Sequence, residues 1–266
     1  MSKHKQNHHL TNALDIMFET KQGPVLNIYC TAGYPRIDSL PTVIRALQDN
    51  GADIIEIGMP YSDPVADGPV IQQSNMQALE NGMTIELLFQ QLDSMKEEIH
   101  VPLVLMGYLN PVLQYGIDEF CARAAACGVS GLILPDLPMH EYKTEYRSIF
   151  EAYGLHAIFL VSPQTSEARM AAADKLSGGF LYAVSSSATT GSTTEDAGKL
   201  GYFERLRSFE FRNPVLIGFG ISNHALFAEA AEYARGGIIG SAYIRALSEG
   251  QDISTTTREF MAGIRG

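Results

Sequence analysis

The sequence predicts an α/β fold in which about eight parallel strands, each followed by a helix, close into a (β/α)8 barrel, or TIM barrel. The chain has 266 residues, close to the length of about 250 that is usual for one such barrel. Short apolar runs recur roughly every 25–35 residues, each followed by a longer segment with one apolar face. No internal linker or low-complexity block divides the chain. Residues 1–266 are therefore expected to form a single domain, with residues 1–9 as a disordered tail.

The expected strands are short, apolar and rich in residues that favour β structure. They cover Val25–Thr31, Asp53–Gly58, Pro102–Gly107, Gly131–Leu134, His156–Val161, Phe180–Val184, Val215–Gly218 and Gly237–Ile239. About eight alternating strand–helix units favour a closed barrel, because a doubly wound sheet usually has fewer strands.

Helical patterns lie between these strands, with apolar residues at spacings of three and four, which is typical of a helix with one buried face. They include Ser39–Asn50, Ile85–Glu98, Ile117–Cys127 and Glu167–Leu176. A further helix, at about residues 10–20, precedes the first strand and is expected to cover the floor of the barrel.

The charge of the chain narrows the classes of partner. The net charge is -11, and Lys and Arg form no run. Nucleic acid and anionic membranes are therefore poor partners, because binding to them depends on the neutralisation of phosphates. A small anionic substrate remains compatible, since backbone N–H groups bind phosphate in an acidic protein as well.

The cysteines and the N-terminus indicate a cytoplasmic protein. Cys30, Cys121 and Cys127 are odd in number and have neither a disulfide pattern nor a C-x-x-C spacing for zinc, so no metal site is expected. The segment Met1–His9 is polar and lacks the apolar region of a signal peptide. The apolar stretch Val101–Leu113 is interrupted by prolines and is too short to span a bilayer.

Glu56 lies in the second expected strand. Side chains alternate across a strand, so Ile55 and Ile57 share the face that packs on helices, while Glu56 points into the barrel. Burial disfavours the ionised carboxylate and raises its pKa, which suits a group that acts as acid and base near neutral pH. The alternative is a Glu that pairs internally with Lys or Arg, but no partner is evident on the other strands. We therefore interpret Glu56 as a catalytic candidate.

The loop after this strand, Met59–Pro69, contains three prolines, which restrict its backbone and hold the side chains that it carries with little loss of entropy. Two of these side chains are carboxylates, Asp63 and Asp67. Each stands before Pro or Gly, where Asp commonly caps a turn. Spacing alone does not decide which of the two has a function.

Glycines follow the seventh expected strand, in Gly218–Ser222, and lie around the eighth, in Gly236–Ser241. Glycine lets the backbone approach a ligand closely, and a helix N-terminus presents free N–H groups to an anion. Barrels frequently bind phosphate at these two loops with the help of a short extra helix. Such a helix is expected at about Ala242–Ser248, beginning next to Ser241, and the pattern favours a phosphate site.

The segment Ser185–Gly198 follows the sixth expected strand and is rich in Ser, Thr and Gly. It lies on the face where barrels carry their active sites. Because loops of this length in compact domains are usually functional or disordered, we interpret it as a lid in preference to a flexible surface loop.

Along nearly its whole length the chain resembles the tryptophan synthase α subunit family. The segment Glu56–Pro69 (EIGMPYSDPVADGP) matches that family's most specific motif. Supporting matches are Gly107–Pro111 (GYLNP), Leu134–Pro138 (LPDLP), Gly218–Ser222 (GFGIS) and Ile239–Ser241 (IGS).

The resemblance implies a role for each matching residue. Glu56 is the implied acid and base, and Asp67 the group that holds the indole nitrogen. The other implied substrate contacts are Tyr29 and Tyr108 in the indole cavity, Tyr182 in the pocket, Thr190 on a closing loop, and Gly191, Gly220, Gly240 and Ser241 at the phosphate.

The resemblance also implies the reaction and the partner. The reaction is the retro-aldol cleavage of indole-3-glycerol phosphate to indole and glyceraldehyde 3-phosphate, so the chain is expected to be a carbon–carbon lyase. No metal or organic cofactor is implied for this chain. The implied partner is a β subunit that carries pyridoxal phosphate, in an αββα assembly (α2β2 heterotetramer) that makes L-tryptophan.

One departure from the family pattern falls in the expected lid, where Ser186 stands at a position that many members fill with Arg. Two alternatives to the lyase remain at this point. One is a catalytically silent chain that only activates a β subunit. The other is a different phosphate-binding barrel enzyme, such as phosphoribosylanthranilate isomerase or indole-glycerol-phosphate synthase, which rely on other catalytic residues.

Overall fold

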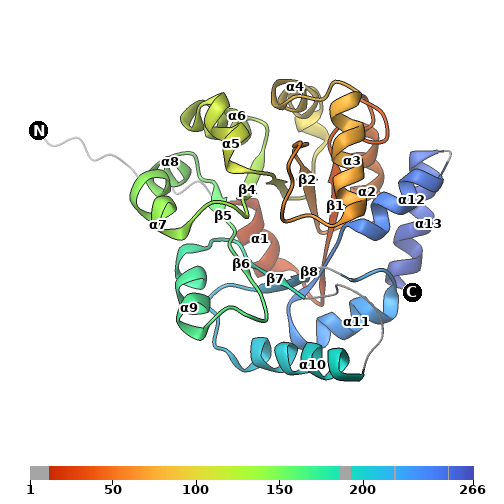
Figure 1. The fold of residues 1–266 in the computed structure, drawn as a ribbon. Helices are drawn as coiled ribbons and strands as arrows, with labels where there is room; N and C mark the ends of the chain where they lie inside the picture. The colour runs from red at the N-terminus through yellow and green to blue at the C-terminus, as the bar shows by residue number, and fades with distance from the viewer. Residues whose placement is uncertain (1–11, 186–192, 219, 251) are drawn as a thin grey trace, which may run out of the picture.

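The computed structural model describes residues 12–185, 193–218, 220–250 and 252–266. The tail expected at residues 1–9 lies outside this part of the chain. Parallel strands occupy the centre of the molecule and helices surround them (Figure 1). The strands are β1 (Val25–Thr31), β2 (Ile54–Gly58), β3 (Leu103–Met106), β4 (Val129–Ile133), β5 (His156–Ala157), β6 (Leu160–Val161), β7 (Leu181–Val184), β8 (Val215–Gly218) and β9 (Gly236–Ile239).

The strands pair in the order β5-β4-β3-β2-β1-β9-β8-β7-β6. The two outer strands, β5 and β6, are separated in sequence by only Ile158 and Phe159. The N–H of Ile158 donates to Leu132 O at 3.0 Å, and Phe159 O accepts from the N–H of Tyr182 at 3.1 Å. A single chain segment therefore pairs with β4 on one side and with β7 on the other, and this pairing closes the sheet into a barrel. The expected strand His156–Val161 comprises β5 and β6, and the predicted (β/α)8 barrel is confirmed.

Helices follow the strands and pack around them, as the apolar periodicity predicts. Their bounds are α1 (Ala13–Thr20), α2 (Leu40–Asp49), α3 (Pro69–Glu80), α4 (Ile85–Met95), η1 (Lys96–Glu98), α5 (Leu109–Tyr115), α6 (Ile117–Ala126), α7 (Met139–Glu141), η2 (Tyr142–Tyr146), α8 (Arg147–Ala152), α9 (Glu167–Leu176), α10 (Thr193–Ser208), α11 (His224–Tyr233), α12 (Ser241–Glu249) and α13 (Ile253–Arg265). None of the helices in the described ranges is long and apolar enough to cross a membrane.

The prediction of a loop over Ser185–Gly198 is wrong for the second half of this segment. Helix α10 begins at Thr193, so the residues from there to Gly198 are helical. Polarity without apolar periodicity does not distinguish a polar helix from a loop, which is why the pattern was misleading. The first half of the predicted lid lies mostly outside the described residues.

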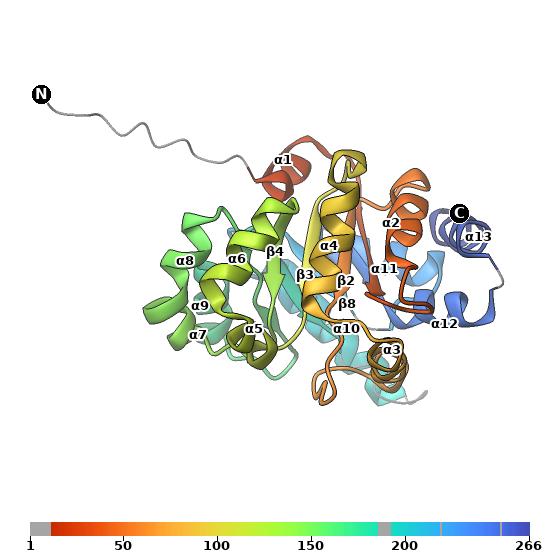
Figure 2. The same ribbon diagram turned by 90° about the horizontal axis from the view of Figure 1, so that it is seen from above.

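Helix α1 covers the end of the barrel at which the strands begin, as predicted. Leu14 is fully buried, and a Cβ atom added at Gly179 would lie 2.9 Å from its side chain. Asn12 caps the helix by accepting from the N–H of Leu14, and its Nδ2 donates to Ser130 O at 2.8 Å. Figure 2 shows α1 at one end of the barrel, and α3 with the segment that leads into it at the other.

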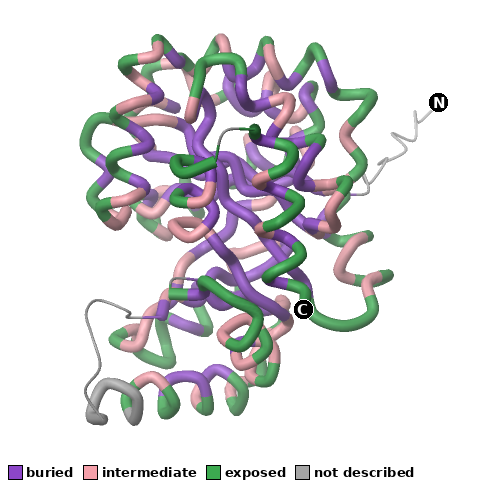
Figure 3. Tube along the Cα trace, turned by 90° about the vertical axis from the view of Figure 1, so that its right-hand side faces the viewer, coloured by how far each residue is buried: buried purple, intermediate pink, exposed green. Residues whose placement is uncertain are grey.

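The strands are buried on both faces, since their inner residues fill the barrel and their outer residues pack against helices. In β2, every residue from Ile54 to Gly58 is buried, and Ile55 and Ile57 have no exposed surface. Figure 3 shows this continuous buried centre, with exposed positions confined to the helices and loops around it. Burial on both faces is typical of parallel sheets.

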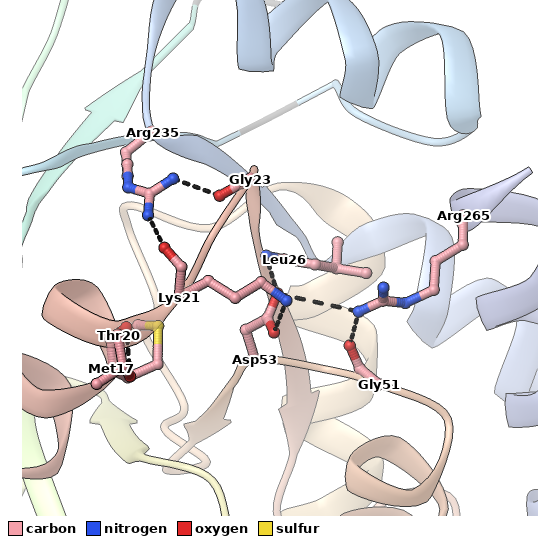
Figure 4. A network of polar contacts seen from close by, with 9 residues as sticks. All are labelled: Met17, Thr20, Lys21, Gly23, Leu26, Gly51, Asp53, Arg235 and Arg265. Atoms are coloured by element: carbon pink, nitrogen blue, oxygen red, sulfur yellow. Dashed lines mark hydrogen bonds and ion pairs between the residues drawn. The ribbon is translucent and has the colours of Figure 1, made fainter.

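Asp53 joins four separate parts of the chain at the floor of the barrel (Figure 4). Its Oδ1 lies 2.7 Å from Lys21 Nζ, and its Oδ2 accepts from the N–H of Leu26 at 2.9 Å. Arg265, near the end of α13, lies 3.9 Å from the same Oδ2. Arg235, before β9, donates to the backbone oxygen of Lys21. The start of β2 is thereby tied to the segment after α1, to β1 and to the last helix.

We expect Asp53→Ala to lower the free energy of unfolding by about 2–3 kcal/mol, because it leaves a half-buried ammonium group and a strand N–H without their acceptor. Urea unfolding measures this change. The matched control is Asp38→Ala, which removes a carboxylate whose side chain is 78% exposed and which pairs with Arg36 at 3.6 Å. Equal losses in the two variants would contradict a structural role for the Asp53 network.

Candidate active site

A cavity of about 310 Å³ opens beside β1, β2 and the segments that follow β8 and β9. It is lined by Tyr29, Glu56, Asp67, Gly68, Pro69, Val70, Ile71, Met106, Tyr182, Gly220, Ile221, Ser222, Ile238, Gly240, Ser241, Ala242 and Arg245. These residues come from the carboxyl ends of the strands and from the loops after them, where barrel enzymes carry their active sites. The cavity brings together most of the residues that the sequence analysis selected.

Glu56 lines this cavity and is 1% exposed. It stands opposite Tyr29 in the register of β1 and β2. Its Oε2 accepts a hydrogen bond from Asn27 Nδ2 at 2.9 Å. Burial raises the pKa of Glu56 to about 8, the hydrogen bond from Asn27 opposes this rise, and the charge of Asp67 adds to it. Among the described residues Glu56 forms no ion pair with Lys or Arg, so the alternative of an internal salt bridge has no support.

The raised pKa of Glu56 predicts a pH dependence of stability. Between about pH 4.5, its ordinary pKa, and about pH 8, the folded chain keeps a proton that the unfolded chain releases. The free energy of unfolding should therefore fall as the pH rises through this window and level off above it. Glu56→Gln removes the titration, and we expect the stability of the variant relative to the wild type to rise by about 4 kcal/mol from about pH 5 to about pH 8.5.

Urea unfolding at the two pH values measures this gain. Glu97→Gln, a change at an exposed carboxylate of η1, is the control and should follow the wild type. If Glu56→Gln also follows the wild type at both pH values, the raised pKa is contradicted.

The two carboxylates of the loop between β2 and α3, Asp67 and Asp63, have different surroundings. Asp67 lines the cavity, and its Oδ2 accepts from Tyr108 Oη at 3.2 Å and from Asn75 Nδ2 at 3.5 Å. Its buried Oδ1 has no hydrogen-bond partner among the described residues. Burial raises the pKa of Asp67 to about 6, and the two hydrogen bonds moderate this rise. Asp63 is exposed and accepts from Ser62 Oγ at 2.6 Å, so Asp67 is the carboxylate that faces the cavity.

Two buried tyrosines, Tyr29 and Tyr182, form walls of the cavity. A Cβ atom added at Gly58 would lie 2.0 Å from Tyr29 Oη, and one added at Gly218 would lie 2.4 Å from Tyr182 Oη. Any larger residue at either strand end would displace the neighbouring ring. The glycines that end β2 and β8 therefore make room for the two rings.

Tyr108 does not line the cavity, although the resemblance implies that it does. It is 3% exposed and lies behind Asp67, where its hydroxyl donates to Asp67 and accepts from the N–H of Ala66 at 2.9 Å. The ring of Tyr61 lies 5.1 Å from it, centre to centre. In this arrangement Tyr108 holds Asp67 in place.

The far end of the cavity is lined by Gly220, Gly240 and Ser241. Helix α12 begins at Ser241, and no side chain in the described chain caps its start. The free N–H groups of its first turn and its helix dipole favour an anion at this point. The exposed Arg245, one turn further along α12, lines the same cavity and was missed by the sequence analysis. The signal available was its position four residues after Ser241, which places both on one helix face.

The remaining predicted contacts, Thr190 and Gly191, lie outside the described residues, as does Ser186. Within the described ranges no three His, Cys, Asp or Glu side chains are placed to hold a metal ion. The three cysteines are buried free thiols.

Comparison with known proteins identifies relatives over almost the whole chain. The sequence model of a family described as Tryptophan synthase alpha chain matches residues 17–264. A tryptophan synthase alpha chain from Flavobacterium johnsoniae is 49% identical over 242 residues, which are 91% of this chain and 95% of the relative. One from Bacteroides thetaiotaomicron is 45% identical over 242 residues, 91% of this chain and 94% of the relative.

Two of the solved structures that resemble this chain are also tryptophan synthases. The crystal structure of a tryptophan synthase alpha chain from Legionella pneumophila has a TM-score of 0.83 and 32% identity, and the match covers 96% of both chains. A ligand-free tryptophan synthase from M. tuberculosis has a TM-score of 0.83 and 34% identity, with 96% of this chain and 100% of that chain covered.

Proposed function

Because this chain belongs to the tryptophan synthase alpha chain family, which cleaves indole-3-glycerol phosphate to indole and glyceraldehyde 3-phosphate, we propose that the cleavage takes place between Glu56 and Asp67 in the cavity described above. The observation that carries this proposal is the pair of carboxyl groups that line one cavity, Glu56 buried and Asp67 half-buried. Pairs of titratable groups with separated pKa values commonly divide acid and base roles in an active site.

The reaction breaks the bond between indole C3 and the adjacent glycerol carbon. Indole leaves only after C3 has been protonated, which makes C3 tetrahedral and the ring cationic. Glu56 as the neutral acid donates this proton. The resulting carboxylate then takes the proton of the glycerol hydroxyl while the carbon–carbon bond breaks. The electron pair of this bond moves into the cationic ring and restores its aromaticity, and the glycerol carbon becomes the carbonyl carbon of the aldehyde. Glu56 is protonated again at the end, and no Schiff base to a Lys is needed.

The two pKa values match this sequence of events. With its pKa raised to about 8, Glu56 is mostly protonated at neutral pH, which the first step requires. With a pKa of about 6, Asp67 is mostly ionised there. Its carboxylate accepts the ring N–H and stabilises the cationic ring, an interaction that is strong in a site of low dielectric.

The remaining cavity residues would bind the two ends of the substrate. The rings of Tyr29 and Tyr182 suit the flat indole ring, since aromatic pairs pack well offset or edge to face. The phosphate would lie at Gly220, Gly240 and Ser241, close to the positive end of α12. The resemblance adds Gly191 to the phosphate contacts and implies that Thr190 belongs to a loop that closes over the substrate.

The partner of the chain is the tryptophan synthase β subunit, in an α2β2 heterotetramer that uses the indole for L-tryptophan synthesis. We propose that pyridoxal phosphate is bound by the β subunit and that this chain carries no cofactor of its own. The exposed tip of the loop between β2 and α3, where Val65 is 85% exposed, supports a contact face at this end of the barrel. We further propose that the chain is a single domain and acts in the cytoplasm.

The test of this function is the release of indole from indole-3-glycerol phosphate by the purified chain, with and without the cognate β subunit. We expect slow cleavage by the chain alone and faster cleavage in the complex. Substrate binding without cleavage in either mixture would identify a silent activator of the β subunit. Cleavage that persists in a variant lacking both carboxyl groups would contradict the proposed site.

A further inference from the structure

Asn27 is a polar side chain in the interior of the barrel with 0% exposure. Its Nδ2 donates to Glu56 Oε2 at 2.9 Å, while its buried Oδ1 has no hydrogen-bond partner among the described residues. A buried amide oxygen without a partner is costly, and an apolar residue of similar size would avoid this cost. A residue that only filled the barrel would not be expected to carry an amide at this point.

Asn27 reaches Glu56 from below the cavity. In the pairing of β1 with β2, Asn27 stands opposite Ile54, and Tyr29 stands opposite Glu56. The inner side chains of β1 are therefore Asn27 in the deeper layer and Tyr29 in the layer that lines the cavity. Asn27 is not among the residues that line it, so it can act on the reaction only through Glu56.

The hydrogen bond distinguishes the two oxygen atoms of Glu56. Oε2 accepts from Asn27. Oε1 has no hydrogen-bond partner among the described residues, but it does not belong to the buried atoms that lack a partner, so it retains some exposed surface. Oε1 is thus the oxygen that remains accessible in the cavity. An N–H donor is compatible with Oε2 both in the carboxylate and as the carbonyl oxygen of the protonated acid, in which the proton resides on Oε1.

We propose that Asn27 is a positioning residue for the cleavage, whose amide holds Oε2 of Glu56 as an acceptor so that Oε1 is the oxygen that exchanges the proton with the substrate. This inference rests on the role of Glu56 proposed above. The other titratable groups near Glu56 are Asp67, Tyr29 and Cys30, together with Tyr182 from β7. Within the described residues, the donor to Oε2 of Glu56 is Asn27.

The test compares Asn27→Leu with Ile28→Ala, a truncation at a fully buried residue on the outer face of the same strand. We expect Asn27→Leu to lower kcat roughly tenfold to a hundredfold, because the proton-carrying oxygen is no longer held in place, and to change KM less than about twofold. Stability should change little, because the substitution removes the unpaired Oδ1 of Asn27 but leaves Oε2 of Glu56 without its donor. Ile28→Ala should lose stability but keep kcat. Asn27→Ala replaces Asn27→Leu if the latter does not fold.

A second measurement is independent of turnover. The carboxylic acid C=O band of Glu56, assigned by its absence in Glu56→Gln, is titrated by difference infrared spectroscopy. Loss of the donor favours the protonated acid, so in Asn27→Leu the midpoint should rise by about one pH unit. An unchanged midpoint with unchanged kcat would overturn the inference and leave the proposed function intact. Full activity of Glu56→Gln would instead overturn the proposed function.

Discussion

Glu56→Gln is expected to lower kcat for indole release by roughly a hundredfold to ten-thousandfold, the range that a general acid or base usually contributes. The amide has nearly the shape of the protonated carboxyl group, but it neither donates a proton to indole C3 nor accepts one from the glycerol hydroxyl. Because the proposed phosphate contacts, Gly220, Gly240 and Ser241, are unchanged in this variant, KM should change little. Steady-state indole release by the isolated chain measures both constants.

The control for this variant is again Glu97→Gln, which changes an exposed carboxylate that does not line the cavity. The loss of activity should occur together with the gain in stability at high pH predicted above. A variant that becomes more stable while it becomes inactive has lost a costly functional group, which separates this outcome from damage to the fold. Near-normal kcat in Glu56→Gln would remove Glu56 from the mechanism.

Asp67→Asn is expected to lower kcat by roughly tenfold to a thousandfold, because the cationic ring loses the carboxylate that stabilises it in the transition state. The effect should be smaller than that of Glu56→Gln, since Asp67 transfers no proton in the proposed steps. The neighbouring Asp63→Asn is the matched control: it lies in the same loop, is exposed and does not line the cavity. Equal losses in the two loop variants would show that the loop matters only as a whole.

The pH profile distinguishes the two carboxyl groups further. In the wild type, kcat/KM should rise with pH as Asp67 ionises near pH 6 and fall as Glu56 ionises near pH 8. Asp67→Asn should lose the rising limb. Since the charge of Asp67 contributes to the raised pKa of Glu56, the falling limb should also move to lower pH in this variant. A falling limb that stays in place would contradict the coupling between the two groups.

Much of the fold and part of the site follow from local patterns in the sequence. The apolar runs predict the strands because each strand is buried on both faces, so its composition is set by the barrel as a whole. The alternation of side chains in β2 places Glu56 on the inner face, because Ile55 and Ile57 occupy the outer one. The glycines before Ser241 indicate the phosphate end, since a close backbone approach and a helix start are both local features.

Local patterns in the sequence did not decide which other residues meet in the cavity, and the tertiary structure did. Asp67 and Asp63 have similar neighbours in the chain, and Asp67 differs by facing the cavity and by its contact with Tyr108, 41 residues away. The hydrogen bond from Asn27 to Glu56 spans 29 residues, and no periodicity marks it. Local patterns report which face of an element is apolar, whereas burial, pKa and hydrogen bonding depend on which distant elements the closed barrel brings together.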